Sequence, residues 1–152
     1  MFILNWLQIR RMNRLLVLLA FCLISLGGLA QTKDETAINK MLMAQVDEWN
    51  KGNIFGYMKG YWDNDSLVFI GKNGPTYGYK PTLERYLKSY PDAAHMGQLT
   101  STIVSMKKLS EDYYFVIGKW ALKRDAGDVG GSYTLLIRKL HGAWVIVCDH
   151  SS

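Results

Sequence analysis

The stretch SYTLLIRKLHGAWVIVCDHSS (residues 132–152) consists of two apolar segments separated by the dipeptide His141-Gly142. Each segment is rich in β-branched and aromatic residues, which favour strands. A two-residue linker that contains glycine favours a tight hairpin turn between them. The sequence therefore predicts an antiparallel β-hairpin that reaches almost to the last residue.

The same period-two pattern continues upstream of this hairpin. The segments QLTSTIVSMKKL (98–109) and YYFVIGKWALKR (113–124) flank the turn SED, and the polar loop DAGDVGG (125–131) follows. Together with the hairpin they predict four long antiparallel strands. Because the last three strands are apolar at both parities, we expect both faces of the sheet to be covered, one by helices and the other by a second subunit or by the sheet curling round. A homodimer through the outer sheet face is predicted.

The first part of the domain shows helical spacing instead. Apolar residues in TKDETAINKMLMAQVDEWNKGN (32–53) recur every three or four positions, and IFGYMKGYW (54–62) predicts a short second helix. SLVFIG and TYGY predict a hairpin of short strands. KPTLERYLKSYP (80–91) predicts a third helix that begins at Pro81 and is followed by a loop. Helices that precede an antiparallel sheet indicate an α+β fold.

Residues 1–30 have the features of a secretory signal peptide. Three arginines at 10, 11 and 14 precede the apolar run LLVLLAFCLISL (15–26), and small residues lead to a predicted cleavage after Ala30. Met12 offers an alternative start, and an uncleaved membrane anchor is the alternative to cleavage. The expected product is a single exported domain, residues 31–152, which is periplasmic or secreted and not attached to the membrane.

The charge of the chain lies largely in this leader. Without residues 1–30 the chain keeps 15 basic and 13 acidic side chains, so its formal net charge falls from +5 to +2. This balance gives no basis for nucleic-acid binding. Cys148 is the single cysteine of residues 31–152, which excludes an internal disulfide.

The order of these segments resembles the nuclear transport factor 2-like superfamily, and in particular its small exported bacterial domains related to polyketide cyclases. The resemblance covers residues 31–152. It is carried by the hairpin LVFIGKNGPTYG, the helix after it, and the ending in which Arg138, Lys139, Gly142 and Trp144 precede His150 and two serines. It implies a cone-shaped, curved antiparallel sheet wrapped around N-terminal helices, with one central pocket and commonly a dimer. Relatives include isomerases, dehydratases, cyclases and plain binding domains, so the fold alone assigns no activity.

The end of the last strand raises the question of which polar residue faces this pocket. Adjacent strand residues point to opposite faces, so Asp149 and His150 cannot form a dyad in one cavity. His150 shares parity with Trp144 and Ile146, which predicts that His150 faces the pocket; a β-bulge would reverse this assignment. His150 is a candidate general base, or an exposed residue at the chain end. Asp63 is a second catalytic candidate, with turn formation as its alternative role.

Aromatic residues supply the candidate ligand contacts. Tyr61, Trp62, Tyr77 and Trp120 come from different elements, and with His150 they are predicted to bind a small apolar or aromatic molecule. His95 and His141 are expected in exposed loops, so the three histidines give no metal-ligand pattern. No metal or cofactor is expected.

Three functions are consistent with this pattern. The first is a binding domain for a small molecule in an aromatic-lined apolar pocket. The second is a cofactor-free isomerase, dehydratase or cyclase that uses a pocket His or Asp as general base, with a tyrosine that stabilises the oxyanion. The third is a dimerisation or partner-binding module, for which a filled centre and an apolar outer patch are expected.

Overall fold

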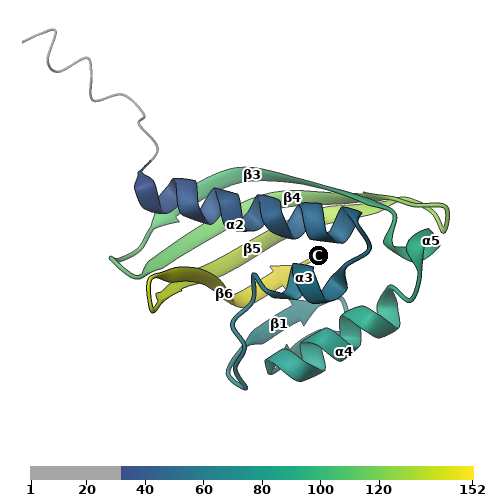
Figure 1. The fold of residues 1–152 in the computed structure, drawn as a ribbon, viewed down its shortest axis with the longest axis horizontal. Coiled ribbons are helices and arrows are strands. Elements are labelled where there is room, and N and C mark those ends of the chain that lie inside the picture. The colour runs from purple at the N-terminus through teal and green to yellow at the C-terminus, as the bar shows by residue number, and fades with distance from the viewer. Residues whose placement is uncertain (1–31) are drawn as a thin grey trace, which may run out of the picture. The chain divides into compact units, whose positions relative to one another are not determined.

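The computed structural model describes residues 32–152 (Figure 1). The predicted signal peptide, its cleavage site and the alternative start at Met12 lie outside these residues. The elements are, in chain order, α2 (Lys33–Asn50), α3 (Ile54–Met58), β1 (Val68–Gly71), β2 (Gly74–Tyr77), α4 (Tyr79–Ser89), α5 (Ala93–Met96), β3 (Gln98–Lys108), β4 (Tyr113–Lys123), β5 (Val129–Leu140) and β6 (Ala143–Ser151). This order confirms the predicted α+β fold.

The six strands form one sheet in the order β2-β1-β6-β5-β4-β3. The four long strands are antiparallel neighbours, as predicted, and the sheet curves around the helices, which lie across one of its faces (Figure 1). One pairing differs from the prediction, because β1 runs parallel to β6, with Val68 opposite Cys148 and Ile70 opposite His150. The sheet is therefore mixed rather than wholly antiparallel. This pairing brings the short hairpin beside the last strand.

Two helix predictions need correction. Helix α4 begins at Tyr79, two residues before Pro81. The segment predicted as a loop after α4 contains the one-turn helix α5, because the Asp92 side chain accepts a hydrogen bond from the His95 backbone N–H at 3.0 Å and caps it. His95 is exposed, as predicted. His141 is exposed as well, and φ is positive at both His141 and Gly142, as a tight hairpin turn requires.

The core lies between the helices and the concave face of the sheet. Its fully buried residues include Ile38 and Met58 from the helices and Val116, Ile137 and Ile146 from the strands. Ile38, Leu42 and Trp49 of α2 lie at the predicted helical spacing and are all buried. The three- and four-residue periodicity of this segment therefore identified its core face correctly.

A polar contact ties the start of α2 to the C-terminal hairpin. Oδ1 of Asp34 accepts hydrogen bonds from Lys139 Nζ at 2.9 Å and from Trp144 Nε1 at 3.3 Å. The Lys139 hydrogen bond is the main reason that the Asp34 pKa is lowered from its usual value. These bonds hold one end of α2 on the sheet. No helix of residues 32–152 is long and apolar enough to span a bilayer.

Candidate functional site

A cavity of about 340 Å³ lies between the helices and the concave face of the sheet. Its walls combine aliphatic, aromatic and hydroxyl-bearing side chains with one amide, two cationic side chains and one acidic side chain. The lining residues are Leu42, Gln45, Val46, Trp49, Tyr57, Tyr61, Phe69, Gly71, Lys72, Arg85, Tyr86, Ser89, Tyr90, Leu99, Ser101, Trp120, Leu122, Tyr133, Leu135, Ile146, Asp149, Ser151 and Ser152.

The carboxyl group belongs to Asp149 on β6, whose side chain is only 3% exposed. Tyr61 donates a hydrogen bond from its hydroxyl to Asp149 Oδ2 at 2.6 Å. Ser151 donates from Oγ to Asp149 Oδ1 at 2.7 Å. Both carboxyl oxygens therefore have a donor, as a buried acidic group requires.

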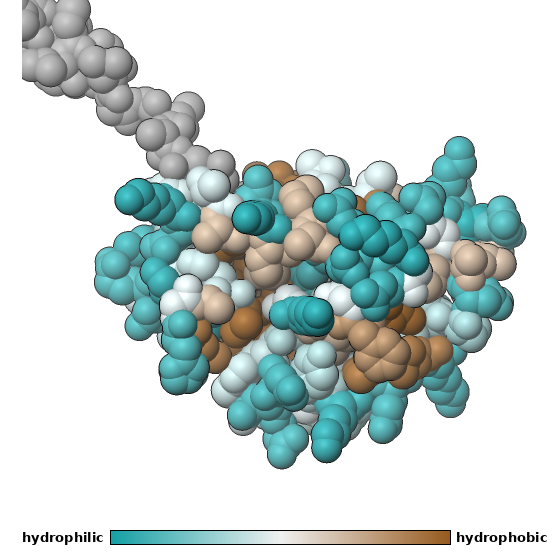
Figure 2. All heavy atoms as spheres, in the orientation of Figure 1, coloured by the Kyte–Doolittle hydropathy of each residue, from teal (hydrophilic) through white to brown (hydrophobic). Residues whose placement is uncertain are grey.

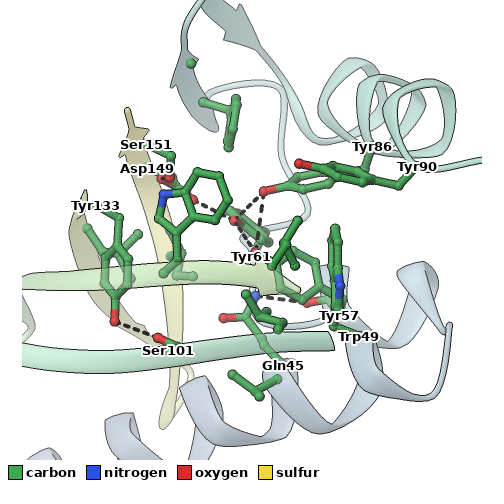
Figure 3. A pocket seen from close by; sticks show the side chains of 18 of the residues that line it. Gln45, Trp49, Tyr57, Tyr61, Tyr86, Tyr90, Ser101, Tyr133, Asp149 and Ser151 are labelled. Atoms are coloured by element: carbon green, nitrogen blue, oxygen red, sulfur yellow. Dashed lines mark hydrogen bonds between the residues drawn. The ribbon is translucent and has the colours of Figure 1, made fainter. Parts of the chain in front are cut away.

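Three tyrosine hydroxyls meet beside this carboxyl, and we refer to Tyr57, Tyr61 and Tyr86 as the tyrosine cluster (Figure 3). The Tyr61 and Tyr86 hydroxyls are 3.2 Å apart, and that of Tyr57 lies 3.4 Å from Tyr61 and 3.5 Å from Tyr86. Each phenol has one proton to donate. Because Tyr61 donates its proton to Asp149, its oxygen can only accept from the other two hydroxyls.

Burial governs the protonation of this group. It raises the pKa of Asp149, and the hydrogen bonds from Tyr61 and Ser151 offset part of that rise. Burial also raises the pKa of Tyr57 to about 12 and holds the pKa values of Tyr61 and Tyr86 well above 10. The three phenols are therefore neutral hydrogen-bond donors near neutral pH. Of these four side chains, the Asp149 carboxyl is the most acidic, so it is the first to lose its proton as the pH rises.

The backbone explains how Tyr61 reaches a residue 88 positions away. The chain after α3 runs parallel to β6, with Tyr61 bridged to Ile146. The Trp62 N–H donates to the Ile146 carbonyl at 2.9 Å, and the Ile146 N–H donates to the Gly60 carbonyl at 2.8 Å. This short parallel pairing places the Tyr61 side chain beside the inward face of β6.

Buried polar contacts position Tyr57 as well. Gln45 of α2 is buried and donates from Nε2 to the Tyr57 carbonyl at 2.9 Å. Asn53 caps α3 by accepting from the Gly56 N–H at 2.9 Å. The short helix contains Gly56; the Asn53 cap stabilises its first turn, and the Gln45 bond holds it against α2. The helix therefore presents Tyr57, and Tyr61 follows four residues later in the segment paired with β6.

A β-bulge in β6 decides that Asp149 faces the cavity. Leu136 is opposite Cys148, but Ile137 is opposite Ile146, so Val147 is an extra residue in the ladder. Strict alternation from Trp144 and Ile146 predicted an inward His150, and that prediction is wrong. His150 is exposed and does not line the cavity. The inward residue is Asp149, which the alternation had assigned to the outer face.

A ring of aromatic side chains forms the wall next to α2 and α4. Trp49 makes edge-to-face contacts with Tyr57, Tyr86 and Tyr90, at centroid distances of 5.1, 6.1 and 4.7 Å. Its Nε1 donates to the Met96 carbonyl at 3.2 Å, which fixes the indole orientation. Such contacts hold the aromatic rings in defined positions around the cavity.

The opposite wall comes from β3, β4 and β5. Ser101 and Tyr133 share a hydrogen bond of 3.0 Å between their hydroxyls. Gly118 lies directly under the Tyr133 ring, where any Cβ would overlap the ring atoms. Trp120 also lines the cavity, and within residues 32–152 its buried Nε1 has no hydrogen-bond partner. An unpaired buried donor is uncommon, and a bound acceptor would satisfy it.

The predicted site residues have different outcomes. Tyr61 and Trp120 line the cavity, as predicted. Trp62 is half-buried outside it, and Tyr77 is 65% exposed on the edge strand β2. Asp63 is exposed in the segment after α3, so it does not face the cavity either. Residues 32–152 contain no group of three His, Cys, Asp or Glu side chains arranged to hold a metal ion.

Comparison with known proteins places this fold in a family. No protein-family model matches the chain, and no curated protein matches it. A solved nuclear transport factor 2-like protein of unknown function from Shewanella oneidensis MR-1 is 40% identical, with a TM-score of 0.74 over 77% of this chain and 97% of its own.

More distant solved structures share the fold alone. A ketosteroid isomerase-like protein from Erwinia carotovora atroseptica SCRI1043 is 19% identical, with a TM-score of 0.61 over 79% of this chain and 97% of its own. A putative calcium/calmodulin-dependent protein kinase type II association domain from Thiobacillus denitrificans ATCC 25259 is 15% identical, with a TM-score of 0.62 over 74% of this chain and 90% of its own. On its identity to the Shewanella protein and its curved sheet, the chain belongs to the nuclear transport factor 2-like superfamily.

Proposed function

We propose that the domain binds a small, mostly apolar molecule in its cavity and that Asp149 and the tyrosine cluster contact the polar group of that molecule. The observation that carries the proposal is the position of Asp149, a nearly fully buried carboxyl in a wall of aliphatic and aromatic side chains. Burying a carboxyl is costly, and a ligand that hydrogen-bonds to it would recover part of that cost. A few polar groups in an apolar cavity are typical of ligand sites.

The hydrogen-bonding capacity of the site favours a ligand with both a donor and an acceptor. Each carboxylate oxygen can accept a further bond besides those from Tyr61 and Ser151. A ligand O–H or N–H would donate there. The unpaired Nε1–H of Trp120 would donate to a ligand carbonyl or ether. The cavity also favours binding over a purely structural module, for which a filled centre was expected.

A cavity-filling variant tests the proposal. Ser101 of β3 lines the cavity, whereas its neighbour Thr102 is exposed. Small molecules extracted from the purified wild-type protein are identified by mass spectrometry, and the measurement is repeated with Ser101→Phe and Thr102→Phe. We expect the co-purified compound to be lost from Ser101→Phe and retained by Thr102→Phe. Equal retention in both variants, or no compound in the wild type, contradicts binding in this cavity.

A second candidate, proton-transfer catalysis, rests on the raised pKa of Asp149 and its hydrogen bond with Tyr61. One solved structure of the same fold is described as ketosteroid isomerase-like, although at 19% identity it is evidence of the fold only. In this hypothesis the Asp149 carboxylate removes a proton from carbon next to a ligand carbonyl and returns it to another carbon. A neighbouring hydroxyl or the Trp120 N–H donates to the oxygen that becomes negative.

Hydrogen–deuterium exchange of 2-tetralone, followed by NMR in D₂O, tests this chemistry. The probe has an apolar bicyclic body and acidic hydrogens beside a carbonyl. We expect exchange above the uncatalysed rate with the wild type and none above it with Asp149→Asn. Asp63→Asn is the matched control, since Asp63 is exposed and does not line the cavity. Equal exchange with wild type and Asp149→Asn excludes Asp149 as the base.

We further propose that the domain is exported and forms a homodimer through the outer face of its sheet. Export is supported by the basic, apolar and small-residue pattern of residues 1–30. The dimer is supported by a row of outward residues, Phe115, Leu136 and Cys148, aligned across three strands, and by Ile117, which is 38% exposed. A second copy would cover these side chains.

A further inference from the structure

Two cationic side chains line the cavity, one from α4 and one from the turn between β1 and β2. Arg85 of α4 is half-buried, and Lys72 in the β1–β2 turn is exposed. Among residues 32–152, neither has a carboxylate within ion-pair distance. We call this pair the cationic rim. Cations in a cavity wall without a protein counterion provide a place for a ligand anion.

Contacts from the short hairpin hold the Arg85 guanidinium in place. It lies over the Phe69 ring, with its central carbon 4.8 Å from the ring centroid, and Nη1 donates to Thr76 Oγ1 at 3.1 Å. Gly71 provides the room, because a Cβ there would overlap Nη2. The guanidinium is thus positioned in advance at the cavity wall, and within residues 32–152 most of its five N–H donors have no acceptor.

The rim and Asp149 give the cavity wall two unlike polar groups, one cationic and one acidic. Arg85 and Lys72 come from α4 and the β1–β2 turn. Asp149 lies on β6 among hydroxyl groups (Figure 3). Phe69 connects the two groups, because the Arg85 guanidinium lies over its ring and Asp149 is its partner in the β1–β6 ladder. A negative group next to the Asp149 carboxylate would be repelled, whereas the same group at the rim would be attracted.

We propose that the ligand is an organic anion whose carboxylate binds Arg85 and Lys72, with an apolar aromatic or alicyclic body in the cavity and a neutral hydrogen-bonding group at Asp149. This inference depends on the proposed binding function and defines its ligand class. A planar guanidinium matches a carboxylate with two parallel hydrogen bonds, which makes Arg85 the main determinant. Lys72 is more solvated and adds a weaker attraction.

Matched charged and neutral probes test the inference. Calorimetric titration compares 6-hydroxy-2-naphthoate with its neutral amide, 6-hydroxy-2-naphthamide, on the wild-type protein. Both carry the same body and the same hydroxyl for Asp149. We expect the acid to bind roughly tenfold or more tightly than the amide, the size of effect usual for a hydrogen bond to a charged group.

Variants then locate the source of this preference. In Arg85→Gln the acid-to-amide preference should fall close to one while the affinity for the amide changes less than about twofold, and in Lys72→Gln it should fall less. Lys88→Gln is the matched control, because Lys88 lies on the same helix but does not line the cavity. It removes one positive charge and should leave the preference unchanged.

Salt dependence of the wild type gives a readout that requires no variant. Added salt should weaken binding of the acid and leave the amide unaffected. The anion inference is overturned if the acid and the amide bind the wild type equally, or if the preference for the acid survives in Arg85→Gln. In either case, binding of the amide would still support the cavity as a binding site. If neither probe binds, both the anion inference and the proposed function are rejected for ligands of this size.

Discussion

The Tyr61 hydroxyl donates a 2.6 Å hydrogen bond to Asp149 Oδ2, and this bond joins the segment after α3 to the last strand of the sheet. Tyr61 is 3% exposed, as is Asp149, so the bond is shielded from water. Its donor also accepts from the hydroxyls of Tyr57 and Tyr86. The stability and the protonation of the site are therefore coupled.

Replacing Asp149 with asparagine should stabilise the protein at neutral pH. The buried carboxyl has a raised pKa, so its ionised form opposes folding, and the neutral amide removes that cost. We expect the free energy of unfolding to rise by roughly 1–3 kcal/mol, the usual cost of an incompletely compensated buried polar group. Denaturant titration at pH 7 measures it.

The pH dependence of this difference has a defined sign. Below the ordinary aspartate pKa of 3.8 the carboxyl is protonated in both the folded and the unfolded chain. As pH rises through the raised folded pKa, the unfolded chain loses its proton first, so wild-type stability falls relative to Asp149→Asn. A difference that stays constant as pH rises from 3.8, the ordinary value, to neutrality would contradict the raised pKa.

Replacing Tyr61 with phenylalanine should destabilise the protein. The change removes a hydrogen bond to a buried acidic group, a loss of roughly 1.5–3 kcal/mol in the free energy of unfolding. It should also raise the Asp149 pKa further, because the Tyr61 hydrogen bond lowers it. Tyr77→Phe is the control, since Tyr77 is 65% exposed, and it should cost less than about 0.5 kcal/mol. Equal effects of both changes would show that the Tyr61–Asp149 bond is dispensable.

Replacing Gly118 with alanine should push the Tyr133 ring away from β4. A methyl group at Gly118 overlaps the ring, and overpacking of this kind costs roughly 1–3 kcal/mol. The change should also break the hydrogen bond between Tyr133 and Ser101. A double-mutant cycle checks the cause, because Gly118→Ala should be nearly neutral in a Tyr133→Ala background. Additive effects would place the strain elsewhere.

Light scattering after size-exclusion chromatography tests the proposed homodimer. We expect residues 31–152 to elute with the mass of two chains at micromolar concentration. Ile117→Lys should produce monomers, because it places a charge on the outer sheet face. Phe55→Lys is the matched control, since Phe55 is 61% exposed on α3 and not on the sheet. A monomeric wild type would contradict the proposal.

N-terminal sequencing of exported material tests the signal peptide. We expect the mature chain to begin at Gln31, after cleavage at Ala30. Substituting Ala30 with a bulky residue such as tryptophan should prevent cleavage at this site. Material that retains residues 15–26 would instead support the alternative of a membrane anchor.

Figure 2 shows that the helical face carries mainly hydrophilic side chains, with a cluster of hydrophobic atoms over α3 and α4. Phe55 and Leu87 are the exposed large apolar residues on these two helices. The spacing of apolar residues in the sequence did not predict that these two side chains would be exposed. On α4, Leu83, Tyr86 and Leu87 form an apolar stripe by their spacing, yet Leu87 is exposed, whereas Tyr86 and the polar Thr82 are buried. A helix stripe predicts a face, but its neighbours in the fold determine which residues of that face are covered.

Local sequence determined the elements of this protein. Helical spacing from Ile38 to Trp49 and strand alternation from Gln98 onward depend only on which side chains must leave water, so they were readable without a structure. The two-residue turn at His141 and Gly142 likewise follows from local backbone geometry. The α+β class and the strand order of the meander followed from these patterns. Tyr61 and Trp120 were expected in the cavity only because the resemblance implied a cone, and Trp62 and Tyr77, expected there on the same ground, do not line it.

Tertiary structure alone decided the chemistry of the cavity. One extra residue at Val147 turned Asp149 inward and His150 outward, and no local preference marks that position. The parallel pairing of β1 with β6, which places Arg85, Phe69 and Gly71 beside the cavity, joins segments some 80 residues apart. The physical reason is that strand register and long-range pairing depend on how the whole sheet packs on its helices. The contacts that decide them involve many segments, so no single segment of the sequence predicts them.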